Sequence, residues 1–312
     1  MYFQTAGIEI NPLIPPLVAM VISFFTSMGG VSGAFLLLPF QMSVLGFTSP
    51  SVSATNQLFN IVAIPSGVYR YVKEGRMVWP LTWIVIIGTL PGVLIGAIIR
   101  VKYLPDPKNF KFFVGLVLLY IGLRMINDIF FKKDVLEKQK SSEKEFQKIV
   151  SKHRKRQGQQ LPAVEIKEFS IFKISYDFYG TNFTINTFWI FILSFVVGII
   201  GGVYGIGGGA IIAPFFISFF GLPVYTVAGA ALMGTFVTSV AGVAFYQAIS
   251  PFYPNMAVAP DWMLGLLFGL GGTVGMYLGA RAQKFIPAKA IKIILSACIF
   301  FVAAKYIVNF FR

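Results

Sequence analysis

A dense run of glycines inside an apolar segment is the feature that most constrains how this chain can fold. The stretch GGVYGIGGGAIIAPF at 201–215 has six glycines in its first nine residues, within an apolar segment that runs from Phe188 to Phe220. Each glycine costs a helix interior about 1 kcal/mol, and backbone released from helical hydrogen bonds costs several kcal/mol more if it faces lipid. The sequence therefore predicts a helix break that is buried in protein or lines a polar cavity.

The residues of this break leave two explanations open. Bare backbone N–H groups followed by a half-helix would favour a bound anion, because the helix dipole places positive charge at the same point. Close packing is the alternative, since small residues four apart let membrane helices approach one another. The density of glycines, together with the following Pro214, favours an anion site.

The composition is that of an integral membrane protein. Of the 312 residues, 56% are hydrophobic and only 12% are charged, with a mean hydropathy of +0.75, whereas soluble domains average about 25% charged residues. No lysine or arginine precedes Arg70, so we expect the first apolar segment to be retained rather than cleaved as a signal peptide. The net charge of +14 is explained by cationic cytoplasmic loops, so no nucleic-acid partner is expected.

Apolar segments near or above the length that crosses a bilayer follow one another along the chain. They fall at about 13–46, 52–69, 79–99, 109–131, 187–220, 224–248, 262–280 and 288–311. Between the fourth and fifth lies an insert, 132–186, with 12 of the 26 Lys and Arg residues and 7 of the 12 acidic ones, which must lie outside the membrane. Its first part, Lys132–Gln160, is a charged stretch, and the alternating β-branched and aromatic residues of 164–185 predict short strands.

The chain repeats itself on the two sides of this insert. Aligning Pro39 with Pro214 places Gly46 on Gly221 without a gap, and a glycine triplet recurs further on, with Gly88, Gly92 and Gly96 matching Gly271, Gly275 and Gly279. We therefore expect an all-α polytopic membrane protein built from two repeats, 1–131 and 187–312, with a small β-containing insert at 132–186.

The long first and fifth segments can each cross the membrane once or fold back at their glycines, and both topologies remain open. The arms on either side of each break, about 12–15 residues long, are too short to span about 30 Å, which favours re-entrant hairpins. Each half then adds three crossings, the halves are inverted, and the insert lies in the cytoplasm with the basic loops at 70–76 and 281–292. The basic 100–111 loop does not fit this arrangement. Transporters often use this plan, with the site where broken helices meet.

Polar residues inside apolar segments are the candidate site residues, because no HExxH, CxxC, GxSxG or paired-carboxylate motif is present. We accordingly expect that the protein is not an enzyme and that it binds no metal and no cofactor. The second segment carries Asn56, Gln57 and Asn60, and the two asparagines share one helix face. These amides line a substrate path or simply join helices. Thr235 and Tyr204 are further candidates, although a threonine hydroxyl can bond to its own helix and a tyrosine can serve packing alone.

At these residues the sequence resembles the TauE/SafE family of sulfite exporters and related membrane permeases. The resemblance rests on GGVYGIGGGAIIAPF at 201–215 and its continuation at 221–243, with a weaker copy, MGGVSGAFLLLPF, at 28–40. It implies export of sulfite or an organosulfonate such as sulfoacetate across the cell membrane of a prokaryote. It also implies a binding turn in the second copy, formed by Gly205, Gly207, Gly208 and Gly209. The first copy would supply a turn opposite it, formed by Gly29, Gly30 and Gly33.

The sequence therefore predicts a transporter that exports a small sulfur-containing anion by alternating access. The alternatives are a channel for small anions or neutral solutes, an importer of sulfur-containing or carboxylate anions, and a membrane anchor for a soluble partner. The expected partners are a small anionic substrate and the lipid bilayer, and a homodimer is left open. Because the first copy has Val31, Ser32 and Ala34 where the second is nearly all glycine, a single asymmetric site is expected.

Overall fold

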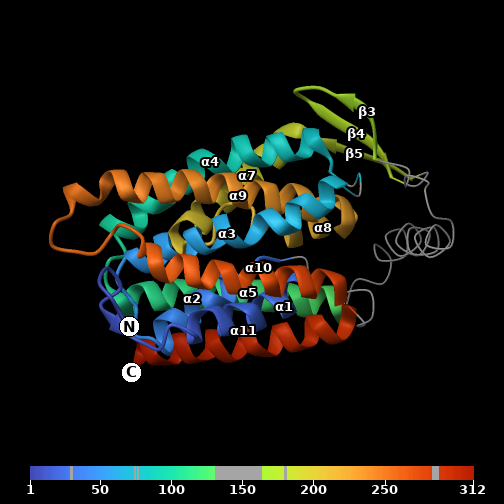
Figure 1. Ribbon diagram of the computed structural model, residues 1–312. Coiled ribbons are helices and arrows are strands. Elements are labelled where there is room, and N and C mark those ends of the chain that lie inside the picture. The colour runs from blue at the N-terminus through green and yellow to red at the C-terminus, as the bar shows by residue number, and fades with distance from the viewer. Residues whose placement is uncertain (29–30, 74, 76, 131–163, 179–180, 283–287) are drawn as a thin grey trace.

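The chain forms an elongated bundle of helices with a small β-sheet at one end (Figure 1). This computed structural model describes residues 1–28, 31–73, 75, 77–130, 164–178, 181–282 and 288–312. A short N-terminal hairpin, β1 (Tyr2–Phe3) and β2 (Ile8–Glu9), precedes the first group of helices: α1 (Ile14–Met28), α2 (Ala34–Ser43), α3 (Ser51–Lys73), α4 (Trp79–Lys102) and α5 (Pro107–Phe130). The second group contains α7 (Thr187–Tyr204), α8 (Ile212–Phe220), α9 (Val224–Ile249), the short 3-10 helix η1 (Ser250–Phe252), α10 (Trp262–Ala282) and α11 (Ala288–Phe311).

The helices follow the apolar segments of the sequence. Among the described residues, four helical stretches are long and apolar enough to cross a membrane: Trp79–Lys102, Thr187–Tyr204, Thr226–Phe252 and Trp262–Gly279. Shorter apolar helices occupy Ile14–Ser27, Ala34–Ser43 and Leu295–Phe311. This combination of apolar helices is that of a multi-pass membrane protein.

The two halves of the chain interlock. Helix α4 of the first half packs along α7 of the second, and α10 of the second packs along α1 of the first. In the same manner α3 packs against α10, and α4 packs against α9. The pairs α3–α9 and α5–α11 join helices that hold equivalent positions in the two halves. Because exchanging the two groups of helices reproduces these pairs, the packing looks the same from either half.

Glycine stripes make two of these pairings close. A Cβ atom on each glycine of the α4 stripe would run into a backbone carbonyl of α7, since Gly88, Gly92 and Gly96 face the oxygens of Phe191, Phe195 and Ile199. The α10 stripe meets α1 in the same way, with Gly271, Gly275 and Gly279 facing the oxygens of Pro16, Met20 and Phe24. The contacted residues of α1 and α7 are related by the same sequence offset that relates Pro39 to Pro214.

Of the four arms beside the breaks, only α1 has a length within the 12–15 residues expected. Helix α7 has 18 residues and α8 only 9, whereas α1 has 15 and α2 has 10. At 1.5 Å per residue α7 is about 27 Å long, which makes it a candidate membrane span. It is longer than expected because Gly201 and Gly202 belong to the helix, where a Cβ on Gly202 would strike the carbonyl of Val93 on α4. The break itself begins only at Gly205.

The insert ends in an antiparallel sheet of β3 (Glu165–Phe169), β4 (Lys173–Phe178) and β5 (Thr181–Asn186), in that order, which confirms the expected strands. The hydroxyl of buried Tyr176 lies 3.0 Å from Thr226 Oγ1 at the start of α9, and it donates there because Thr226 itself donates to Pro223 O. Burial raises the pKa of Tyr176, so the phenol stays protonated. The sheet is thereby tied to α9, whereas Lys132–Gln160 lies outside the described residues.

We expect Gly92→Ala and Gly275→Ala each to destabilise the protein by about 1–3 kcal/mol, because the added Cβ would enter space that a backbone carbonyl fills. Gly67→Ala in α3 is the matched control, since its Cβ would meet only Leu232 Cδ1 at an ordinary 3.4 Å, and alanine favours a helix over glycine. Thermal unfolding in detergent, followed by circular dichroism, measures the difference. Equal midpoints for the Gly92 and Gly67 variants would contradict the close packing of α4 on α7.

Candidate functional site

The second helix break lies between α7 and α8 and is buried along its whole length. Helix α7 ends at Tyr204, and α8 begins at Ile212. Gly205 and Gly207 have φ angles of +82° and +77°. Residues with a Cβ are strained in this left-handed region, so the chain path itself requires glycine at both positions.

The glycines of the break also lie against three neighbouring helices. A Cβ atom on each would approach another atom closer than 3.0 Å. The obstructing residue is Ser53 of α3 for Gly205, Thr89 of α4 for Gly208 and Ala231 of α9 for Gly209. Gly207 faces Ser239 of α9, whose Oγ would lie 2.8 Å from its Cβ. Close packing, the alternative explanation of the glycine run, is therefore a property of all four positions.

Several backbone groups of the break are already hydrogen-bonded within the protein. The amide of Gly208 donates to Thr238 Oγ1 at 3.0 Å. The amides of Gly205 and Ile206 both donate to the carbonyl of Gly201, at 2.9 Å and 3.0 Å. These N–H groups satisfy the rule that buried backbone must find partners, and in this conformation they do not point at an empty space.

The first break is described only in part, because Gly29 and Gly30 lie outside the described residues. Gly33 precedes α2 directly, and a Cβ there would lie 2.8 Å from Ser23 Oγ on α1. The carbonyl of Gly33 accepts from Leu36 and Leu37, which begins the helical hydrogen bonds of α2. Gly33 thus holds α2 close to α1, as the second-break glycines hold their neighbours.

Two asparagines of α3 join the two breaks. The Nδ2 of Asn56 donates to the carbonyl of Ala34 at 3.0 Å and to that of Gly205 at 2.9 Å, and its Oδ1 accepts from Gln41 Nε2. The Nδ2 of Asn60 donates to the carbonyl of Ile206 at 2.9 Å, and its Oδ1 accepts from Ser32 Oγ at 2.6 Å. Both side chains are fully buried. The shared face predicted for these residues is thus used to connect the first break to the second.

The other predicted side chains have different surroundings. The Thr235 hydroxyl donates to Ala231 O of its own helix at 2.8 Å, and the Tyr204 hydroxyl donates to Phe35 O of α2 at 2.7 Å. Gln57 is fully buried against Gly242 of α9, yet neither its Oε1 nor its Nε2 makes a hydrogen bond within the described residues. Of the predicted side chains described here, Gln57 alone has its whole hydrogen-bonding capacity unused.

Three further buried polar residues, Ser53, Tyr246 and Arg100, lie near this region and were not expected there. Ser53 is one turn before Gln57 on α3, and Tyr246 is one turn after Gly242 on α9. Arg100 lies in the last turn of α4 and is fully buried, although its place in the sequence suggested an exposed basic loop. The only signal for it was an arginine that directly follows an apolar run.

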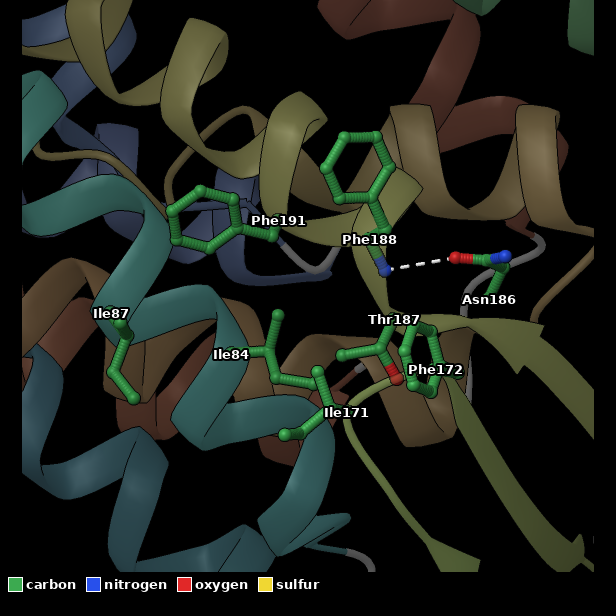
Figure 2. Close-up of a pocket in the computed structure, with 8 residues that line it drawn as sticks. All are labelled: Ile84, Ile87, Ile171, Phe172, Asn186, Thr187, Phe188 and Phe191. Carbon is green, nitrogen blue, oxygen red and sulfur yellow. Dashed lines mark hydrogen bonds between the residues drawn. The ribbon is translucent and has the colours of Figure 1, made fainter.

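An apolar cavity of about 490 Å³ lies elsewhere, between α4, the start of α7 and the turn that joins β3 to β4 (Figure 2). Ile84, Ile87, Phe188 and Phe191 line it together with Phe172 of the turn. Both helices are candidate membrane spans, so this cavity opens on a surface suited to lipid chains rather than to a polar solute.

Comparison with known proteins agrees with these features. The family model described as "Sulfite exporter TauE/SafE" matches residues 16–306. The chain belongs to the TauE/SafE family. This assigns it to the membrane transporters and permeases of that type and confirms the resemblance seen at the glycine motifs.

A curated relative supports the same assignment over part of the chain. The "Probable membrane transporter protein YdhB" of Bacillus subtilis (strain 168) is 29% identical over 123 residues, which cover 39% of this chain. The match spans 46% of the relative, less than half of its length. No solved structure matches the chain.

We expect Asn56→Leu to destabilise the protein by roughly 2 kcal/mol, because interhelical hydrogen bonds in membrane proteins average about 0.6 kcal/mol and Asn56 makes three. Ser66→Ala is the control on the same helix, since its hydroxyl bonds only to Ala63 O of α3 itself. Unfolding in mixed micelles by increasing detergent measures both free energies. If the Asn56 and Ser66 variants have the same free energy of unfolding, the Asn56 amide does not hold the breaks together.

Proposed function

We propose that this TauE/SafE protein exports a small sulfur-containing anion, sulfite or an organosulfonate such as sulfoacetate, across the cell membrane by alternating access. The observation that carries the proposal is the meeting of two helix breaks at one polar turn of α3, deep inside a bundle of apolar helices. Broken helices that meet in the interior are the usual place for a substrate site in transporters built from repeats. The family description, sulfite exporter, supports the choice of substrate.

The proposed topology has two inverted halves, 1–131 and 187–312, each with three crossings and a re-entrant hairpin. In the second hairpin α7 is long enough to reach across most of the bilayer, and α8 turns the chain back toward the end from which α7 entered. The direction of the chain supports it: α1 starts at the end of the bundle that holds the N-terminus, and α7 starts at the opposite end, beside β5 (Figure 1). The hairpins α1–α2 and α7–α8 therefore enter from opposite ends. The reciprocal packing of α4 on α7 and α10 on α1 supports the same arrangement.

In this proposal the insert 132–186 lies in the cytoplasm, where its cations follow the positive-inside rule. A negative cell interior then drives an anion outward, with a gain of about 2.3 kcal/mol per unit charge at 100 mV. Export therefore requires no coupling ion. The break residues are enclosed by α3, α4 and α9, which suits a carrier that opens to one side at a time better than a permanently open channel.

Transport by purified protein in liposomes tests this proposal. We expect efflux of sulfite or sulfoacetate that saturates with concentration and accelerates when a potassium diffusion potential makes the interior negative. The matching measurement with a neutral solute should give no flux above that of empty liposomes. Flux that is independent of the imposed membrane potential would contradict passive anion export. Fast flux that does not saturate with concentration would indicate the channel instead.

We expect Gln57→Leu to reduce this transport at least tenfold while leaving the folded protein as stable as wild type. Leucine removes a buried amide that has no protein partner, so the desolvation cost of that amide also disappears. Gln247→Leu on α9 is the matched control, because that side chain is exposed. Parallel measurements of flux and thermal unfolding decide the role of Gln57; unchanged flux would remove it from the substrate path.

A further inference from the structure

We propose that Arg100, Tyr246 and Ser53, together with Gln57, form a buried anion-binding station between the second helix break and the adjacent end of the bundle. This inference rests on the proposed anion transport, because it names the side chains that would select the charge of the substrate. It places that selection beside the glycine turn, on α3, α4 and α9, rather than on bare backbone of the turn.

The first observation is a buried positive charge without a carboxylate partner. Arg100 donates to the carbonyls of Leu104 and Thr48 and lies over the ring of Phe110, yet its Nε has no hydrogen-bond partner. In the part of the chain that the structure describes, no carboxylate forms an ion pair with it. The buried carboxylate of Asp261 accepts instead from two backbone amides. Buried cations are normally paired, so an unpaired one in a membrane protein indicates a functional site.

The second observation is a pair of buried hydroxyls beside this charge that have no partner within the described residues besides each other. Tyr246 is fully buried and belongs to the same cluster of buried side chains as Ala97 and Val101, which lie before and directly after Arg100 on α4. Ser53 is also fully buried, and its hydroxyl lies close enough to the Tyr246 hydroxyl to interact with it. Within the described residues, neither hydroxyl has a hydrogen-bond partner besides the other. Unused hydrogen-bonding capacity of a buried hydroxyl is costly, and here two such hydroxyls lie near one guanidinium.

The third observation is that these groups connect to the glycine turn. The backbone of Gly205 lies directly against Ser53, and Gln57, one turn further along α3, lies against Gly242. Ser53 and Gln57 are four residues apart, as are Gly242 and Tyr246, so each pair shares one face of its helix. Buried polar groups with unused hydrogen-bonding capacity therefore extend from the turn toward Arg100 along the α3–α9 interface.

The chemistry of these groups suits an oxyanion. Two hydroxyls, an amide NH2 and a guanidinium N–H can donate to the several oxygens of a sulfite, sulfonate or carboxylate, and hydrogen bonds from charged donors are the strong ones. A neutral solute would leave the Arg100 charge uncompensated, and a cation would be repelled by it. The station therefore predicts selection by charge and by the number of acceptor oxygens.

A purely structural arginine is the competing explanation, in which Arg100 only fastens the residues around Thr48 and Leu104 to the end of α4. Such a role requires the two carbonyl bonds and the ring contact but gives no function to Tyr246 or Ser53. Variants of these two hydroxyls therefore separate the explanations without disturbing the arginine.

The experiment measures binding of sodium sulfite and sodium sulfoacetate to the full-length purified protein by calorimetry in chloride-free buffer. We expect both anions to bind wild type and a neutral sulfone not to bind. Tyr246→Phe and Ser53→Ala should each weaken anion binding roughly tenfold, as expected for one hydrogen bond to a charged group, without lowering thermal stability. Arg100→Gln should abolish binding, and Arg100→Lys should restore part of it because the charge returns without the planar fork.

Matched controls come from hydroxyls outside the station. Tyr306→Phe removes a hydroxyl bonded to Ser43 and Pro39, so it should lower stability and leave anion affinity unchanged. Ser194→Ala removes a buried hydroxyl that has no hydrogen-bond partner within the described residues, on α7 against Gly88, and should change neither stability nor anion affinity.

The outcomes distinguish the station from the proposed transport. Absence of anion binding to wild type overturns the station, as does wild-type affinity in both the Tyr246 and Ser53 variants; the second result leaves transport itself intact. If the Tyr246 and Ser53 variants weaken anion binding but the protein moves no anion across liposome membranes, the station is supported and the proposed function is overturned. The hydroxyl variants keep the test decisive even if Arg100→Gln does not fold.

Discussion

The hydrogen bonds that Asn56 and Asn60 donate to the two helix breaks are the interactions on which the interior of this protein depends. A break frees backbone carbonyls from helical pairing, and a membrane interior offers no water to replace the lost partners. Two amides one turn apart on α3 satisfy carbonyls of Ala34, Gly205 and Ile206 and accept from Gln41 and Ser32. One polar turn therefore fixes the relative position of both hairpins.

This arrangement changes what the glycines of the second break contribute. Their missing side chains let α3, α4 and α9 approach the broken segment, and the amides of Gly205 and Gly208 already have protein partners. A turn packed and bonded in this way positions a site more than it supplies free donors. Attraction for the proposed anion must then come from nearby side chains, of which Gln57 and the buried Arg100 are the candidates.

Much of the fold could be predicted from the sequence because membrane helices are long, apolar and separated by polar loops. The TauE/SafE motif and the strands of the insert were equally visible. The sequence could not predict which helix each glycine stripe faces, because a glycine indicates a closely packed neighbour without identifying that neighbour. The use of Asn56 and Asn60 was also undetermined, because an amide suited to a substrate is equally suited to a carbonyl. Arg100 was misplaced because its sequence position adjoins a basic loop, while burial depends on how Phe110 and Thr48 fold over it.

The packing of the two halves is repeated, but the polar chemistry is not. Asn56 and Asn60 of α3 align with Ala231 and Thr235 of α9, and the Thr235 hydroxyl bonds only to its own helix. Of the buried groups with unused hydrogen-bonding capacity near the break, Ser53 and Gln57 lie on α3 and Tyr246 lies on α9. The repeated packing gives the protein two related hairpins, whereas the two asparagines that hold both breaks come from α3 alone. The proposed alternating access requires both properties, because a substrate held at one asymmetric point is exposed to either face by motion of the symmetric parts around it.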